Sequence, residues 1–349
     1  MITEKFDTSW ISLTYNCNNR CKWCYTASNS GENQAKSLNP QYEQGIVNLL
    51  SDLRVKRVIL IGGGPTLYKN LYGFLEKISD SEIRPGLVTN GRRLKEPGFA
   101  RGLKERGLDY LTVSIEGESP YAHDSATQIL GSYEDSIKGI DVARLEEIKV
   151  STNTVINSEN IDNLEGLVNS LLSVGIKDIG FNVCGICVSK EENNSYFVNP
   201  AKAAEAFTEV YEKFRNEGIN FKLVTPLPLC FFEEELRKEL REKKIISGGP
   251  CQLVHGKNFV VDYNGDIVPC THLTGFPLLN IFEDKRVISK EKFVELYNDK
   301  NGAAYNFREK LKRYPSGKCD DCVESCAGGC PLLWVKFDPQ EEIKGAENV

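Results

Sequence analysis

Three cysteines stand within one short stretch near the amino terminus, at the spacing C-x3-C-x2-C: Cys17, Cys21 and Cys24, with Trp23 directly before the last. Iron–sulfur clusters are held by Cys thiolates, normally four of them. Three thiolates at this spacing can hold three corners of a four-iron four-sulfur cluster and leave one iron open to another ligand. A structural zinc loop and free thiols are the alternatives. Structural zinc takes four closed ligands, commonly as two C-x2-4-C pairs, which this stretch does not offer.

The elements that must position these thiols follow an alternating strand and helix pattern. Asn39 and Pro40 predict the N-cap and first turn of a helix that reaches about Leu53. Six or so β-α units in sequence indicate parallel strands joined by right-handed crossovers. A parallel α/β barrel presents its chemistry at the carboxyl ends of its strands. We expect the strands at Trp10–Tyr15, Arg57–Ile61, Leu87–Thr89, Tyr110–Ile115, Lys149–Ile156 and Lys177–Val183.

Unusual residues lie at these strand ends in chain order. Any one of them alone is weak evidence, because a glycine after a strand is usually only a turn. Glycine permits close backbone approach to a ligand, and short polar side chains can bind hydroxyl and amine groups. The first strand runs into the cysteines, and the next five end near Gly62-Gly63-Gly64-Pro65, Thr89-Asn90-Gly91, Ser114 with Glu116, Asn153 and Cys184.

The cysteine spacing, the aromatic Trp23 and the strand-end series together resemble the radical S-adenosylmethionine enzymes. The resemblance implies a partial (βα)6 TIM-like barrel over about residues 8–225, with S-adenosylmethionine chelating the open iron. It also implies that Gly62, Gly63 and Gly64, with Pro65, approach the methionyl part of that cofactor. Further cofactor contacts that it implies are Trp23, Thr89, Asn90, Ser114, Glu116 and Asn153. In such enzymes a reduced cluster cleaves the cofactor to a 5′-deoxyadenosyl radical that abstracts hydrogen, and the protein positions and shields the chemistry.

One residue departs from that family's second-strand motif, which is commonly Gly-Gly-Glu-Pro. Here Gly64 takes the place of the acid that helps to hold the methionyl ammonium. Backbone carbonyls would then receive the ammonium instead.

Composition limits the remaining classes of function. The chain has 349 residues and a net charge of −6 without a long basic run, which argues against nucleic acid as the main partner. A signal peptide and a membrane-spanning apolar stretch are both missing from the sequence pattern. Twelve cysteines without secretion signals fit a reducing compartment, where such clusters usually bind metal. We therefore expect a cytoplasmic protein without a membrane partner.

Six further cysteines gather between positions 251 and 330. Asn264-Gly265 between two β-branched runs predicts a hairpin, which would bring Cys251 and Cys270 toward each other. The later run, which ends in Cys-Pro, is close to the bacterial ferredoxin pattern C-x2-C-x2-C-x3-C-P, whose last Cys ligates the other cluster. That analogy assigns Cys319, Cys322 and Cys326 to one cluster and assigns Cys330 to a second cluster with Cys251 and Cys270. A zinc ribbon is the alternative.

This region resembles the SPASM extension of radical S-adenosylmethionine enzymes, a small Cys-rich iron–sulfur domain with two auxiliary [4Fe-4S] clusters, over about residues 248–335. We accordingly divide the chain into a barrel, 1–230, and an auxiliary-cluster domain, 231–349. The family run has two more residues and a further final Cys, so each auxiliary cluster here receives three ligands from the extension. Three other cysteines are candidate fourth ligands, substrate contacts or core thiols: Cys184, Cys187 and Cys230.

The SPASM resemblance favours a peptide or protein substrate, with crosslinking, thioether formation, oxidation or epimerisation as the reaction. The alternatives are a radical enzyme for a small molecule, such as a tetrapyrrole side chain or a sugar, and a non-catalytic iron–sulfur electron carrier. Only sixteen residues precede Cys17, so we expect a separate peptide-recognition protein or direct binding at the barrel mouth. A flavodoxin- or ferredoxin-type reductant is implied. His255, His272 and Tyr25 are candidate acid/base or relay groups.

Overall fold

The fold was examined in a computed structural model of the chain. The residues described are 6–26, 36–185, 195–247, 258–312 and 326–343, with positions 249, 251, 315, 317, 319, 320, 322 and 324. Two residues that the sequence singled out, Cys187 and His255, lie outside this range.

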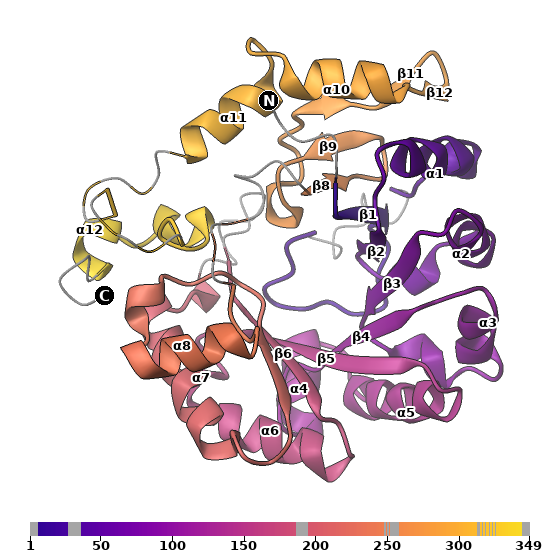
Figure 1. Ribbon diagram of the computed structural model, residues 1–349. Helices are drawn as coiled ribbons and strands as arrows, with labels where there is room; N and C mark the ends of the chain where they lie inside the picture. The colour runs from indigo at the N-terminus through magenta and orange to yellow at the C-terminus, as the bar shows by residue number, and fades with distance from the viewer. Residues whose placement is uncertain are drawn as a thin grey trace.

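A curved sheet of ten strands forms the inner wall of the molecule (Figure 1). Its hydrogen-bonded order is β10-β9-β8-β1-β2-β3-β4-β5-β6-β7, and neighbours from β8 through β1 to β7 are parallel. The expected α/β class is therefore confirmed. The strands are β1 (Thr8–Thr14), β2 (Arg57–Gly62), β3 (Arg84–Thr89), β4 (Tyr110–Ser114), β5 (Lys149–Ile156), β6 (Asp178–Val183), β7 (Asn220–Leu223), β8 (Asn258–Val261), β9 (Asp266–Val268) and β10 (Leu279–Asn280).

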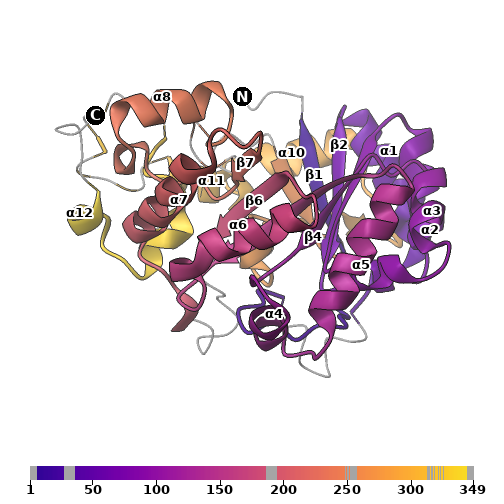
Figure 2. The same ribbon diagram turned by 90° about the horizontal axis from the view of Figure 1, so that it is seen from below.

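Helices pack on the outer side of this sheet, as Figures 1 and 2 show from two directions. Asn39 caps the first helical segment as expected, since its side chain accepts the Gln41 N–H at 3.1 Å. The helices of the parallel part are α1 (Glu43–Asp52), α2 (Leu71–Asp80), α3 (Phe99–Glu105), α4 (Pro120–Thr127), α5 (Ser132–Leu145), α6 (Leu164–Ser173), α7 (Pro200–Phe214) and α8 (Glu234–Glu242).

A seventh parallel strand extends the series beyond the six or so units that the sequence predicts. This strand, β7, has only four residues, and its exposure alternates along Asn220–Leu223. Such a short alternating run carries little strand pattern by itself. It forms because its backbone pairs with β6, with Asp178 opposite Asn220.

The carboxyl-terminal segment joins the same sheet. Strand β8 runs parallel to β1, with Thr8 opposite Asn258. The predicted hairpin is confirmed, because β8 and β9 are antiparallel and Gly265 adopts φ +84° in the turn. Beyond it lie β11 (Phe282–Glu283), β12 (Arg286–Val287), α10 (Lys290–Asn298), α11 (Ala303–Leu311) and α12 (Pro339–Glu342). The division at residue 230 remains a prediction, and the sheet is continuous across it.

An aromatic cluster fastens the extension to the start of the chain. The Phe6 ring packs edge-on against Phe259 at 5.1 Å and against Phe293 at 5.8 Å. All three side chains are almost fully buried, and aromatic edge contacts stabilise the fold beyond the burial of their surface.

No described helix is both long and apolar enough to cross a membrane.

Candidate active site

The loop that follows β1, residues 15–26 and hereafter the cysteine loop, carries the three amino-terminal thiols. The Cys24 N–H donates to the Cys21 carbonyl at 3.2 Å, which turns the chain between these cysteines. Burial, followed by the charges of Cys24, Glu116 and Cys17, raises the pKa of the Cys21 thiol well above its usual range. The three thiols and one carboxyl thus lie close enough to act on one another, as ligands of one cluster and its neighbour must.

Polar groups surround the thiols. The Asn19 N–H donates to Cys17 Sγ at 3.4 Å, and the Cys24 Sγ lies 3.1 Å from the Thr26 hydroxyl. Burial raises the pKa of the Cys17 thiol to about 11. Hydrogen bonds to cluster sulfurs shift reduction potentials, and thiols must lose their protons to bind iron. The loop therefore has the donors that a bound cluster needs.

The glycine turn after β2 is pressed against the backbone of the cysteine loop. Gly62 has φ +141°, and a Cβ on it would lie 2.3 Å from the Thr14 carbonyl oxygen. A Cβ on Gly63 would lie 2.5 Å from the Tyr15 oxygen. The Gly63 and Gly64 N–H groups donate to the carbonyls of Thr14 and Asn16, both at 2.7 Å. Close packing against the backbone of the cysteine loop therefore explains why glycines stand at these positions. Pro65 begins the 3-10 turn that follows them. The contact of the glycines with the methionyl group remains a prediction.

The turn after β3 holds the cysteine loop through side chains. Asn90 donates from Nδ2 to Asn18 Oδ1 at 2.7 Å, and that nitrogen lies 3.9 Å from Cys17 Sγ. The Thr89 hydroxyl accepts the Gly91 N–H at 3.3 Å within the turn. The turn after β3 thus contacts the loop that carries the thiols, and the predicted contact of Thr89 and Asn90 with the cofactor remains a prediction.

Arg92 is a site residue that the sequence interpretation missed. Its guanidinium donates to the Asn18 carbonyl and, at 3.2 Å, to Asn19 Oδ1, and it pairs with Asp135 at 3.2 Å. One planar group thus joins the cysteine loop to α5. Nothing in the sequence pattern distinguishes Arg92 from other loop cations.

The ends of β4 and β5 meet beside the cysteine loop. Ser114 pairs directly with Asn153 in the parallel register. Glu116 is buried; its Oε2 accepts the Val155 N–H at 3.1 Å, and its own N–H donates to His123 Nδ1 at 3.1 Å. Burial raises the pKa of Glu116 to about 7. The site thus holds a buried carboxyl that titrates near neutrality, next to Cys21.

Trp23 belongs to the cysteine loop, and its side chain is buried. It shares an apolar cluster with Ala126 and Cys184, and its ring stands edge-on to Tyr196 at 5.7 Å. These contacts give Trp23 a packing role, while its predicted contact with the cofactor stays a prediction. Cys184 belongs to this same apolar cluster.

The thiols of the extension form two groups. Burial, followed by the charges of Cys251 and Cys270, raises the pKa of the Cys330 thiol well above its usual range. Burial, followed by the charges of Cys326, Cys230 and Cys322, raises the pKa of Cys319 to about 11. Cys330 thus has Cys251 and Cys270 as neighbours, and Cys319 has Cys326, Cys230 and Cys322. The assignment of these thiols to two clusters remains a prediction.

Tyr25 connects the cysteine loop with the first of these groups. Burial, followed by the charges of Cys24 and Cys270, raises the pKa of Tyr25 far above its usual range. Its ring centroid lies 5.1 Å from that of His272, whose Nδ1 is 3.7 Å from Cys270 Sγ. A Cβ on Gly185, just past β6, would lie 3.6 Å from the His272 ring. The strand ends, the cysteine loop and the extension therefore meet at this pair.

The thiols of the site are of the kind that iron–sulfur clusters take as ligands. Among the described side chains, no three His, Cys, Asp or Glu are placed to hold a single ion, although one zinc needs its thiolates gathered at about 2.3 Å. A four-iron cluster binds each thiolate to a different iron, so its ligands stand farther apart. The three thiols of the cysteine loop and the two further thiol groups would hold such clusters.

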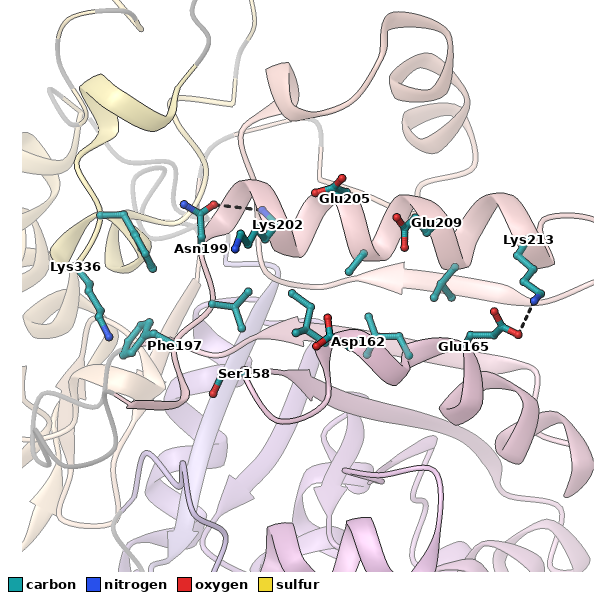
Figure 3. A pocket seen from close by; sticks show the side chains of 16 residues that line it. Ser158, Asp162, Glu165, Phe197, Asn199, Lys202, Glu205, Glu209, Lys213 and Lys336 are labelled. Carbon is teal, nitrogen blue, oxygen red and sulfur yellow. Dashed lines mark hydrogen bonds and ion pairs between the residues drawn. The ribbon is translucent and has the colours of Figure 1, made fainter.

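A groove of about 760 Å³ runs along α7 from the segment that follows β5 (Figure 3). At its near end Ser158 follows β5, and its N–H donates to the Tyr196 carbonyl at 3.1 Å. The groove lies between α7 and the segment that leads into α6. Its lining residues are Ser158, Ile161, Asp162, Leu164, Glu165, Phe197, Val198, Asn199, Lys202, Glu205, Ala206, Glu209, Val210, Lys213, Lys336 and Phe337.

Residues 11–171 match the radical SAM superfamily. This match begins in β1, includes the cysteine loop and the turns after β2, β3 and β4, and ends in α6. The chain therefore carries a radical SAM domain, the class of protein that the fold and the thiols define.

Curated relatives agree with this class and differ in their activities. The chain is 25% identical to the AdoMet-dependent heme synthase of Methanosarcina barkeri over 329 residues, 90% of this chain and 88% of that protein. It is 32% identical to a probable GTP 3′,8-cyclase of Methanopyrus kandleri over 170 residues, 48% of this chain and 53% of that protein. The cyclase similarity thus spans about half of each protein, whereas the heme synthase similarity spans most of both.

Solved structures share the fold of the whole chain. Streptococcus suis SuiB bound to the precursor peptide SuiA superimposes with a TM-score of 0.73 at 17% identity, covering 97% of this chain and 74% of that one. anSMEcpe with bound AdoMet gives a TM-score of 0.68 at 19% identity, covering 93% of this chain and 89% of that one. These likenesses show the fold, with the Cys-rich extension included. The expected architecture, a radical SAM domain followed by a Cys-rich region, is confirmed. The SPASM type of that region remains a prediction.

Proposed function

We propose that the protein is a radical SAM enzyme that abstracts hydrogen from a peptide or protein substrate and so crosslinks, oxidises or epimerises it. Cys17, Cys21 and Cys24 would hold the catalytic cluster. A reduced cluster bound there supplies the electron that cleaves S-adenosylmethionine to methionine and a 5′-deoxyadenosyl radical.

The chain's own residues would bind and orient the cofactor. The buried Glu116 carboxyl beside Cys21 suits an ammonium or a ribose hydroxyl, because the sequence lacks the usual acid at Gly64. Ser114 and Asn153, which are neighbours in the sheet, offer further hydrogen bonds. Close packing of Gly62 and Gly63 on the cysteine loop leaves little room for water on that side, which would protect a reactive intermediate.

The observation that carries the peptide assignment is the groove along α7. From Asn199 to Lys213 the helix spans about 21 Å at 1.5 Å per residue, enough for about six residues of extended chain. Its near end adjoins the cysteine loop, because Glu159, next to Ser158, pairs with Lys22 at 2.8 Å. A groove of that length leading to the site suits an extended segment.

The charges of the groove indicate what kind of segment it would take. Asp162, Glu205 and Glu209 line its middle, and Lys213 is paired with Glu165 at 2.5 Å (Figure 3). Two further cations, Lys202 and Lys336, lie toward the end that holds Asn199 and Phe197. An acidic middle favours a peptide that carries Lys or Arg, through charge complementarity.

Two experiments test the proposal. Replacing Cys17, Cys21 and Cys24 together with Ala should abolish dithionite-dependent formation of 5′-deoxyadenosine and lower the iron content by about four per chain. Undiminished 5′-deoxyadenosine formation would rule out the catalytic assignment. For the substrate, anaerobic incubation with peptides encoded beside the gene should give a mass change on the peptide.

The groove is tested by charge reversal. The double variant Glu205→Lys, Glu209→Lys should raise the KM for a modified basic peptide several-fold. Glu212→Lys, on the same helix but outside the groove, is the matched control and should leave the KM unchanged. Equal values for all three proteins would show that the groove does not bind the substrate.

A small-molecule substrate is the second candidate, and the heme synthase similarity over most of the chain supports it. It predicts turnover of a tetrapyrrole under the same anaerobic conditions, with the peptide left unchanged. For either substrate we propose cytoplasmic activity with a flavodoxin- or ferredoxin-type reductant, without nucleic acid or membrane as a partner. A separate peptide-recognition protein would deliver a peptide that binds weakly alone.

A further inference from the structure

Cys230 lies outside the cysteine run of the extension but is held against it. It sits in the 3-10 turn Leu229–Phe231, between β7 and α8, and its side chain is buried. The other eleven cysteines of the sequence gather at positions 17–24, 184–187 and 251–330, and Cys230 stands apart from all of them. The short turn that contains Cys230 does not by itself explain why a buried cysteine stands at this position.

Backbone contacts fasten the segment before Cys230 to the end of the cysteine run. The Cys330 N–H donates to the Pro226 carbonyl at 2.8 Å. Gly329 has φ +77°, and a Cβ on it would lie 2.7 Å from that same carbonyl oxygen. The two chains thus approach as closely as glycine permits, which fixes residues 226–230 beside residues 326–330.

Charged side chains hold the other flank. Glu324, between Cys322 and Cys326, pairs with Arg237 at 3.5 Å and with Arg241 at 2.9 Å. Both arginines belong to α8, which begins four residues after Cys230. Arg237 is buried, so removing Glu324 would leave a buried cation without this partner. The cysteine run is therefore anchored on both sides of Cys230.

The thiols of Cys230, Cys319 and Cys326 lie in or against the same core. Cys230 and Cys326 are both buried in the main core, and Cys319 packs against it. After burial, the charges that raise the pKa of Cys319 come from Cys326, Cys230 and Cys322, in that order. Cys230 thus lies near enough to Cys319 for its charge to act there, as the charges of Cys326 and Cys322 do, in agreement with the backbone contacts that hold residues 226–230 beside residues 326–330.

We propose that Cys230 is the fourth ligand of the auxiliary cluster held by Cys319, Cys322 and Cys326. The proposal rests on the proposed radical SAM function and on the two auxiliary clusters that the SPASM resemblance predicts. Four thiolates complete the ligand set of a four-iron cluster. Among the other described cysteines, Cys184 packs against Trp23, and Cys251 and Cys270 accompany Cys330. The fourth ligand thus comes from the segment that precedes the extension, and a bound cluster joins the two parts of the chain covalently through iron.

The test uses the full chain with Cys17, Cys21 and Cys24 replaced by Ala, so that only auxiliary clusters contribute. After anaerobic reconstitution this background should hold about eight irons. Adding Cys230→Ser, which keeps the size of the side chain, should remove about one to four irons or convert one cluster to a three-iron form. Its EPR spectrum after reduction should change for one cluster only. Cys184→Ser, an equally buried thiol, is the matched control and should leave iron content and spectrum unchanged.

Three results would overturn the proposal, and they differ in what else they affect. A Cys230→Ser protein with the iron content and EPR spectrum of its background would make Cys230 a packing residue and leave the catalytic assignment intact. Equal losses in the Cys230 and Cys184 variants would indicate a general packing defect. A background that holds no iron would remove the auxiliary clusters altogether, while 5′-deoxyadenosine formation by the wild type reports separately on the radical SAM site. Circular dichroism of each variant verifies folding.

Discussion

The hydroxyl of Tyr15 donates to the carboxylate of Asp262, at 2.8 Å from Oδ1 and 2.7 Å from Oδ2. The two residues stand 247 positions apart in the chain, and both side chains are buried. Tyr15 opens the cysteine loop, two residues before Cys17, and Asp262 begins the turn of the hairpin that leads to Cys270. This contact therefore joins the start of the loop that carries the amino-terminal thiols to the hairpin that leads to Cys270.

Tyr15→Phe should lower the stability of the protein by about 2 kcal/mol, because hydrogen bonds to a buried charged group contribute about 1.5–3 kcal/mol. The lost hydroxyl leaves the Asp262 carboxylate with the N–H of Tyr263, at 2.8 Å, as its remaining donor in the described structure. Thermal unfolding followed by circular dichroism measures the effect. Tyr263→Phe is the control, since within the described residues its hydroxyl has no hydrogen bond. Equal midpoints for the two variants would contradict the role given to Tyr15.

Gly63→Ala should prevent assembly of the amino-terminal cluster and spare the extension. The new Cβ would lie 2.5 Å from the Tyr15 oxygen, and backbone cannot give way as a flexible side chain can. Overpacking of this kind costs about 1–3 kcal/mol, and here the strain falls on the cysteine loop. Iron analysis should show a loss of about four irons per chain, together with loss of 5′-deoxyadenosine formation. Gly249→Ala, where nothing lies within 4 Å of the new Cβ, should behave as wild type.

Arg92→Lys should loosen the cysteine loop without unfolding the sheet. A lysine has one ammonium and cannot bond the Asn18 carbonyl, Asn19 and Asp135 together as the planar guanidinium does. We expect the amino-terminal cluster to be lost several times faster on exposure to air, followed by the decay of its visible absorption. Arg84→Lys is a suitable comparison, because Arg84 makes an exposed ion pair with Asp109 at 3.9 Å. Identical decay in both variants would mean that Arg92 does not position the loop.

The sequence predicted those parts of the site that local pattern encodes. Thiol spacing marked the cysteine loop, strand-end glycines marked its neighbours, and Asn264-Gly265 marked the hairpin, because each depends on residues close together in the chain. Arg92 and the Tyr15–Asp262 bond could not be predicted in this way, since they arise only when distant segments fold together. The packing of Gly62 and Gly63 was also beyond local pattern: glycine indicates that something lies close, and only the fold shows that it is the backbone of the cysteine loop.

The strand count shows the same limit. β7 has four residues of alternating exposure, too few for a hydrophobic period to stand out, so its pairing with β6 depends on the tertiary structure. β8 has a clear β-branched run, but its place beside β1 joins residues about 250 apart. The local sequence therefore predicts that β8 is a strand, whereas its pairing with β1 is known only from the fold.

His123 should make the protein less stable as the pH falls from 7.5 to 5.5. Its imidazole is fully buried, Nδ1 accepts the Glu116 N–H, and burial lowers its pKa to about 4. Asp124 favours the charged imidazole and Arg92 opposes it, both more weakly than burial. The unfolded chain, with the ordinary His pKa of about 6.5, therefore binds more protons than the folded one between these values. The contribution of His123 to stability is full above pH 6.5 and is lost toward pH 4, by on the order of 1 kcal/mol between pH 7.5 and 5.5.

His123→Gln, which cannot take up a proton there, should show a smaller fall in its unfolding midpoint over the same interval. The difference between the two proteins at each pH isolates His123 from the other titrating groups, and parallel curves would show that His123 is not responsible.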